Sequence, residues 1–198
     1  MRPRRHAAIA LALVGAAILA GCSSDPLAED YLDGGNSGYI AGDGILEVAP
    51  DDRGEPIDFA GTTDTGEELA VSDLDGDVVV VNFWYAACAP CRAEAPDLEA
   101  LSQQYDGEGA SFVGVNIYDG AERSLAFARN YDITYPSLLD ASDGTVRLAF
   151  AGDISPQAVP TTFVLDSERR IAARILGQLQ ERSILDTIIR DVLAEDAA

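Results

Sequence analysis

Two cysteines separated by two residues follow closely on an apolar run, and this placement constrains the fold more than any other feature of the chain. The run, residues 78–84, lacks polar–apolar alternation, which is typical of a central strand covered on both faces. Cys88 and Cys91 lie at the predicted start of a helix over residues 89–105, where Pro90 suits the first turn. A thiol pair at such a junction is suited to reversible disulfide chemistry.

The first 21 residues have the features of a signal peptide. Three arginines precede an apolar run over residues 7–20, which is short for a membrane span. The run ends in Leu-Ala-Gly before Cys22, which resembles the lipobox of bacterial lipoproteins, where the cysteine is acylated. We therefore expect an extracytoplasmic protein anchored to the cell membrane by lipidated Cys22. The alternative is an ordinary secretory signal, with Cys22 as an unmodified thiol.

Residues 22–55 are predicted to form an acidic, flexible tether. Nine acids and one base fall between residues 23 and 55, and apolar periodicity is weak. Such a segment buries too little surface to offset its ordering entropy. The alternative, that part of it packs on the domain, applies best to residues 45–48. The remainder, residues 56–198, has the length of one domain.

Charge and histidine content exclude several classes of function. The net charge of −21 argues against nucleic-acid binding, which needs a basic face. The single histidine, His6, lies in the leader, so Ser-His-Asp and Cys-His catalysis are excluded. With Cys22 acylated, only two thiols remain, too few for a structural zinc site. We expect no metal and no cofactor.

Further elements alternate and then form a hairpin. Strands are predicted at residues 57–60, 111–117, 161–166 and 171–176, and helices at 122–130, 145–151 and 180–194. This order predicts an α/β fold with a mixed central sheet flanked by helices, parallel in its first half and antiparallel at its end.

The element order, with the cysteine pair at the first strand–helix junction, resembles the thioredoxin fold. Residues 82–96, Asn-Phe-Trp-Tyr-Ala-Ala-Cys-Ala-Pro-Cys-Arg-Ala-Glu-Ala-Pro, resemble the TlpA/ResA family of membrane-tethered thiol–disulfide oxidoreductases. The resemblance implies a thioredoxin-like domain with an N-terminal strand extension and a central insertion at residues 130–151. Family members usually carry Trp immediately before the first cysteine. Here that residue is Ala87, so a smaller aromatic surface is expected.

The two cysteines are assigned different roles. Cys88 would cap the helix, where unpaired N–H groups stabilise a thiolate and lower the thiol pKa from about 8.5 toward 3.5–7.5. We expect Cys88 to be the exposed attacking thiol and Cys91, more buried, to resolve the mixed disulfide. The alternative is a structural disulfide, but so short a loop stabilises by only about 2 kcal/mol.

Four further residues are candidates for the site. The resemblance implies that Glu94 shuttles the proton of Cys91, whereas spacing alone fits equally well a first-turn acid that complements the helix dipole. The resemblance also implies that Pro160 is a cis-proline beside the cysteines, leaving the Val159 backbone free to pair with an extended client segment. Trp84 is expected either beside the site, in contact with substrate, or in the core.

The leading functional hypothesis is thiol–disulfide exchange on protein clients. The resemblance to ResA implies reduction of apocytochrome c before haem attachment, with a membrane thiol carrier supplying electrons. One alternative is an oxidant of secreted proteins that depends on a membrane oxidase. A peroxide-reducing redoxin and a non-catalytic peptide-binding module also remain open.

Overall fold

The computed structural model describes residues 44–152 and 158–195. Its strands are β1 (Ile45–Glu47), β2 (Ala60–Thr62), β3 (Glu68–Ala70), β4 (Val78–Trp84), β5 (Ala110–Asn116), β6 (Ser137–Leu139), β7 (Thr161–Leu165) and β8 (Ile171–Leu176). The α-helices are α3 (Ala89–Tyr105), α4 (Ala121–Tyr131), α5 (Thr145–Ala149) and α6 (Arg182–Glu195). Short 3-10 turns lie at Pro50–Asp52 and Val71–Asp73. No helix in these described ranges is long and apolar enough to cross a membrane.

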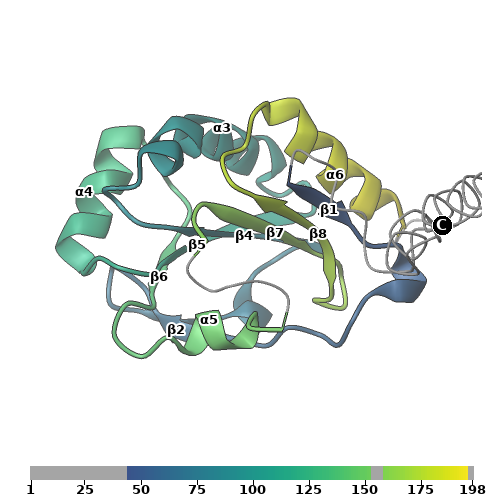
Figure 1. Ribbon diagram of the computed structural model, residues 1–198, viewed down its shortest axis with the longest axis horizontal. Coiled ribbons are helices and arrows are strands. Elements are labelled where there is room, and N and C mark those ends of the chain that lie inside the picture. Colours follow the sequence, from purple (N-terminus) through teal and green to yellow (C-terminus); the bar gives the residue numbers. More distant parts are fainter. Residues whose placement is uncertain (1–43, 153–157, 196–198) are drawn as a thin grey trace, which may run out of the picture. The chain divides into compact units, whose positions relative to one another are not determined.

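Six strands form the central sheet, in the order β1-β8-β7-β4-β5-β6 (Figure 1). β4, β5 and β6 are parallel, whereas β7 is antiparallel to β4 and to β8. The predicted mixed sheet is therefore confirmed, including the change from parallel to antiparallel pairing. β2 and β3 form a separate hairpin, so the strand expected at residues 57–60 instead begins at Ala60.

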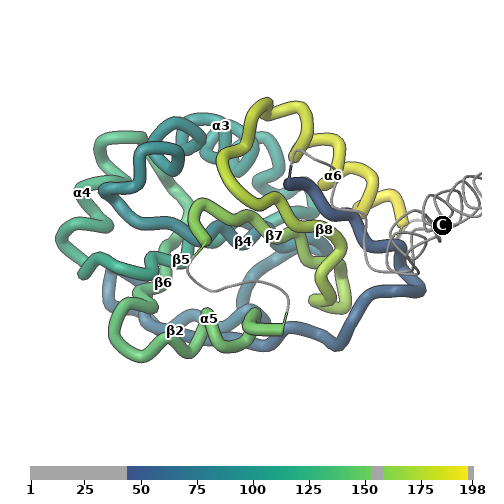
Figure 2. The backbone as a smooth tube through the Cα atoms, viewed as in Figure 1, coloured from purple at the N-terminus to yellow at the C-terminus, as the bar shows by residue number. Residues whose placement is uncertain are grey.

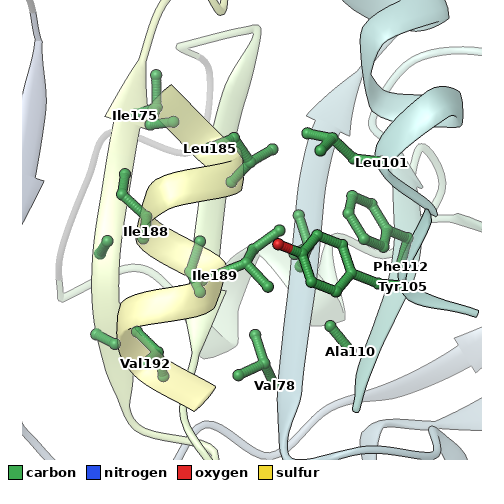
Figure 3. Packing of buried hydrophobic residues seen from close by; sticks show 14 of the residues in the cluster. Val78, Leu101, Tyr105, Ala110, Phe112, Ile175, Leu185, Ile188, Ile189 and Val192 are labelled. Carbon is green, nitrogen blue, oxygen red and sulfur yellow. The ribbon is translucent and has the colours of Figure 1, made fainter. Parts of the chain in front are cut away.

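The apolar strand β4 lies between β7 and β5 at the centre of the sheet, and both of its faces are covered (Figures 1 and 2). Val78 and Val80 point toward the helical layer of α3 and α6, where they pack with Leu101 and Ile189 (Figure 3). Val79, Val81 and Phe83 pack on the opposite face, among the aromatic rings of Phe150 and Phe163. Since side chains alternate along a strand, Asn82 and Trp84 face the same side as Val80, toward α3.

The domain begins earlier than predicted. Residues 45–47 form the edge strand β1, in which Ile45 lies opposite Ile175 and Glu47 opposite Ala173 of β8. The boundary expected at residue 56 is therefore wrong for residues 44–55, and the alternative that residues 45–48 pack on the domain is confirmed. The physical reason is that β1 pairs with the backbone groups that β8 would otherwise leave open at the sheet edge.

Arg53 fixes the remainder of this N-terminal segment. Its buried guanidinium forms ion pairs with Asp166, at 2.9 Å, and with Glu195 of α6, at 2.7 Å. The same side chain donates a hydrogen bond to the backbone oxygen of Val48, at 3.1 Å. The expected signal peptide, Cys22 and the tether up to residue 43 lie outside the described residues.

Candidate active site

The two cysteines form a disulfide at the start of α3. A four-residue turn leads from β4 to the helix, closed by the hydrogen bond from the Cys88 N–H to the Tyr85 oxygen, at 3.1 Å. Cys88 is the N-cap of α3, as predicted, and its sulfur accepts a hydrogen bond of 3.2 Å from the Cys91 N–H. The Cα atoms of the two cysteines are 5.3 Å apart. The helix N-terminus is thus directed at the Cys88 sulfur, the position where a thiolate would form.

The expectation that Cys88 is exposed is wrong for the disulfide form. Cys88 is 3% exposed and Cys91 is 2% exposed, so the two hardly differ. Both lie in a cluster with Trp84, Ala95 and Phe127. α4 supplies Phe127, so a helix distant in the sequence contributes to the cluster that encloses the disulfide. The attacking thiol must therefore become accessible when the disulfide opens or when a client binds.

Trp84 is buried and offers no surface to a client. Its ring centroid is 4.2 Å from that of Phe127, inside the cluster that holds the disulfide. Gly114 on the neighbouring strand allows this position, since a Cβ there would lie 2.8 Å from the indole nitrogen. The expectation that Trp84 packs beside the site is therefore confirmed, whereas its burial does not fit direct contact with substrate.

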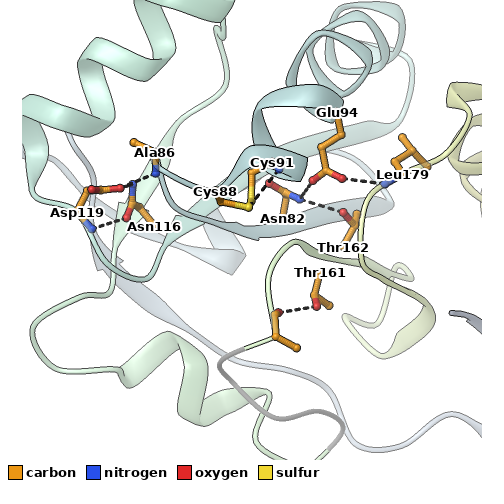
Figure 4. Close-up of a disulfide and its surroundings, with 11 residues drawn as sticks. Asn82, Ala86, Cys88, Cys91, Glu94, Asn116, Asp119, Thr161, Thr162 and Leu179 are labelled. Atoms are coloured by element: carbon orange, nitrogen blue, oxygen red, sulfur yellow. Dashed lines mark hydrogen bonds between the residues drawn. A yellow bond between two sulfur atoms is a disulfide. The ribbon is translucent and has the colours of Figure 1, made fainter.

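Glu94 lies on the buried face of α3, one turn after Cys91, and is 1% exposed. Its Oε1 accepts a hydrogen bond from Asn82 Nδ2, at 2.9 Å, and its Oε2 accepts one from the Leu179 N–H, at 2.8 Å (Figure 4). Burial raises the pKa of Glu94 from 4.5 to about 7, although both hydrogen bonds lower it. A carboxyl with this pKa can accept or release a proton near neutrality, and its burial argues against an exposed partner of the helix dipole.

Asn82 is a site residue that sequence reasoning missed. It is the polar member of the otherwise apolar β4, and its amide nitrogen also donates to Thr162 Oγ1, at 3.0 Å. Asn82 thereby connects Glu94 on α3 with β7, the strand that follows Pro160. The signal was present, because a buried amide must be hydrogen-bonded and an isolated Asn in an apolar strand predicts such a partner.

Asp119 is a second missed residue. Its buried Oδ2 accepts a hydrogen bond from the Ala86 N–H, at 2.6 Å, and so holds the turn that precedes Cys88 (Figure 4). Asn116 positions Asp119 in turn, since its Oδ1 accepts the Asp119 N–H at 2.8 Å. The loop after β5 therefore fixes the loop after β4, as expected where parallel strands end at the same edge of a sheet.

Pro160 and Val159 lie where the resemblance implies. The Val159–Pro160 peptide bond is cis, and Val159 packs against the cluster that contains both cysteines. The Pro160 oxygen accepts a hydrogen bond from the Gly177 N–H, at 2.9 Å. Among the described residues, the Val159 N–H and C=O have no hydrogen-bond partner.

No group of three or more metal-ligating side chains comes together within residues 44–152 and 158–195. A helix-capping sulfur bonded to a second cysteine, a buried carboxyl one turn further along the helix and a cis-proline segment are together suited to exchanging a disulfide with another protein. On a thioredoxin-like sheet, this combination defines a thiol–disulfide oxidoreductase.

The chain belongs to the AhpC/TSA family, whose model matches residues 54–174. It is 32% identical to the thioredoxin-like protein YneN of Bacillus subtilis over 70% of this chain and 79% of that protein. It is 31% identical to the thiol-disulfide oxidoreductase ResA of Bacillus subtilis, over 61% of this chain and 65% of ResA. It is 34% identical to the thiol:disulfide interchange protein HelX of Rhodobacter capsulatus, over 71% of this chain and 72% of HelX.

Solved structures agree with this assignment. A DsbF homologue from Corynebacterium diphtheriae superposes with a TM-score of 0.67 and 26% identity, covering 79% of this chain and 98% of that chain. A secreted thiol-disulfide isomerase from Corynebacterium glutamicum also gives a TM-score of 0.67 at 26% identity, covering 79% and 96%. The thioredoxin-like fold and the enzyme class are therefore established.

Proposed function

We propose that the protein is an extracytoplasmic, membrane-anchored reductant of protein disulfides, with the Cys-x-x-Cys-His segment of apocytochrome c as its client. The observation that carries the direction of electron flow is the apolar and acidic surrounding of the disulfide. Cys91 lies among apolar side chains, and the next buried ionisable group along its helix is the carboxyl of Glu94. Both features disfavour a thiolate on Cys91. A dithiol that is not stabilised gives up its electrons readily, which corresponds to a low reduction potential.

The exchange proceeds in two steps that conserve atoms and electrons. The Cys88 thiolate attacks one sulfur of the client disulfide, and the other client sulfur leaves as a thiolate that takes up a proton. Glu94 then accepts the proton of Cys91, whose sulfur attacks the Cys88 sulfur. The second client sulfur leaves as a thiolate and takes up the proton that Glu94 releases, which restores the carboxylate. Two electrons and two protons have passed to the client, and Cys88 is again bonded to Cys91.

The client and the recycling partner follow from the resemblance to ResA. A reductant that works in an oxidising compartment must be reduced again, and a membrane thiol carrier is the partner we propose. A secreted oxidoreductase among the similar structures supports an extracytoplasmic location. The lipid anchor at Cys22 rests on the sequence alone.

The reduction potential of the Cys88–Cys91 couple tests the proposed direction. Residues 23–198 are equilibrated with defined thiol buffers, and the oxidised fraction is measured. We expect a potential near or below about −220 mV. A potential near about −120 mV would mark an oxidant of secreted proteins instead. Absence of a reversible couple would leave the non-catalytic peptide-binding module.

The oxidant is the second candidate because one observation favours it. The Cys91 N–H donates to the Cys88 sulfur at the N-terminus of a 17-residue helix, and this arrangement stabilises a Cys88 thiolate. A stabilised thiolate raises the reduction potential. The measured potential therefore decides which of the two effects is larger.

A pair of matched variants tests whether the site is catalytic. Cys91→Ala removes the resolving thiol, so mixed disulfides between Cys88 and client proteins should accumulate in cells. Cys88→Ala removes the attacking thiol and should give none. Equal effects of the two changes, limited to stability, would indicate a structural disulfide. The anchor is tested separately by Cys22→Ala, which should move the protein from the membrane fraction to the soluble fraction.

A further inference from the structure

Tyr118 is an exposed aromatic residue beside the active-site turn. It is 76% exposed, although large apolar side chains elsewhere in the described residues are mostly buried. Its ring lies 5.7 Å from the ring of Tyr85, measured between centroids. Tyr85 begins the turn that ends at Cys88. The ring of Tyr118 therefore packs beside the first residue of the turn that leads to the cysteine pair.

The backbone beneath Tyr118 is fixed at several points. The Tyr118 N–H donates to Asn116 Oδ1, at 3.0 Å, and the neighbouring Asp119 accepts the Ala86 N–H. The Ile117 N–H donates to the Trp84 oxygen, at 3.1 Å. The loop that carries Tyr118 is thus hydrogen-bonded to the segment that carries the cysteines. An aromatic ring held in this way loses little conformational entropy when it is covered.

The position next to the attacking cysteine carries no large side chain. Ala87 is exposed in the turn, so no large side chain at this position shields Cys88. A client segment that is bonded to Cys88 lies against the end of this turn. Successive residues of an extended segment are about 3.3 Å apart, and alternate side chains face the protein.

We propose that Tyr118 is a specificity-determining residue that receives a large apolar side chain of the client, about two or three residues from the client cysteine. This inference rests on the proposed exchange reaction and adds the chemistry of the preferred client. An acidic segment is disfavoured in that place, because the chain carries a net charge of −21. An aromatic or aliphatic side chain gains contact area with the ring.

The test uses two peptides that contain a Cys-x-x-Cys disulfide and differ only in the residues two positions before and two positions after it. One peptide has Phe at these positions and the other has Ser. The full-length protein, reduced beforehand, is mixed with each peptide, and the second-order rate constant of peptide reduction is measured. The wild-type protein should prefer the Phe peptide.

Tyr118→Ser should lower the ratio of the two rate constants by about three- to tenfold, as expected for loss of an aromatic contact. Tyr118→Phe should retain the ratio. Leu148→Ser is the matched control, since Leu148 is 73% exposed on α5 and has no part in the site; it should also retain the ratio.

Two outcomes would overturn the inference while leaving the proposed function intact. One is a Phe-to-Ser ratio that Tyr118→Ser does not change. The other is an equal loss of rate with both peptides and with oxidised glutathione, which would show a distorted turn rather than a lost contact. A wild-type protein that reduces neither peptide would refute the exchange function, and this inference with it.

Discussion

Asn82 of β4 donates a hydrogen bond of 2.9 Å to the carboxylate of Glu94 on α3, and this bond spans the interior between sheet and helix. The amide holds the carboxyl behind the disulfide and also partly stabilises its charge. Without such donors, burial alone would raise the pKa of Glu94 further. Burial thus raises the pKa of Glu94, and hydrogen bonds from two donors, Asn82 and the Leu179 N–H, lower it.

Glu94→Gln should remove the contribution of Glu94 to the pH dependence of the free energy of unfolding. Between pH 4.5 and about 7 the unfolded chain has released the Glu94 proton while the folded protein retains it. The free energy of unfolding therefore falls as pH rises through this window, by about 3 kcal/mol in total. Denaturant unfolding at several pH values measures this slope. A slope as steep in Glu94→Gln as in the wild type would contradict the assignment.

Asn82→Leu should raise the pKa of Glu94 by about one unit, because a hydrogen bond to the charged form is lost. The pH profile of client reduction, or the carboxyl carbon resonance of Glu94, reports this shift. Thr162→Val is the control: it removes the other bond of Asn82, at 3.0 Å, and retains the one to Glu94. A similar shift in both variants would show that Asn82 acts only through packing.

Asp119→Ala should destabilise the protein by about 1–3 kcal/mol, because the Ala86 N–H loses its acceptor. It should also change the rate of the first exchange step, since the turn before Cys88 is released. Arg123→Ala provides the control, because the exposed Arg123 forms only an ion pair of 3.2 Å with Asp119. We expect less than about 1 kcal/mol from that change. Equal destabilisation by Asp119→Ala and Arg123→Ala would show that the ion pair, and not the hydrogen bond to the Ala86 N–H, is responsible for the loss of stability.

Arg53→Ala should lower the free energy of unfolding by about 1–3 kcal/mol, since the buried Asp166 loses one partner and keeps its ion pair with Arg170, at 3.0 Å. Arg190→Ala, which breaks an exposed pair of 3.3 Å with Asp186, should change it by less than about 1 kcal/mol. Chemical denaturation of both variants provides the comparison. A negligible effect of Arg53→Ala would show that the ion pairs of Arg53 do not hold residues 44–55 on the domain.

The central part of the fold could be predicted because its signals are local. β4 and α3 occupy the predicted residues, since an unbroken apolar run and a helix-capping cysteine mark their bounds. The three-residue β1 escaped prediction because so short a strand has no periodicity. Its formation depends on the open edge of β8, which lies far along the chain.

The site was predicted less completely than the fold. The cysteines, Glu94 and the cis bond before Pro160 were found from one motif and its resemblance. The burial of Cys88 was not, because it results from a cluster whose members come from β4, α3 and α4, and only the tertiary structure brings these together. The link from Asp119 to the Ala86 N–H is of the same kind.

The register of β1 determines where the preceding chain joins the domain. The Gly44 oxygen accepts the Leu176 N–H, and the adjacent Gly177 N–H donates to Pro160, both at 2.9 Å. The described chain therefore begins at the same end of the sheet as the carboxyl end of β4, which leads to the disulfide. With an anchor at Cys22, the intervening residues could span at most about 75 Å. The proposed anchor would then be attached to the domain at the end of the sheet that carries the active site. A partner in the membrane could therefore reach the sulfurs without rotation of the domain.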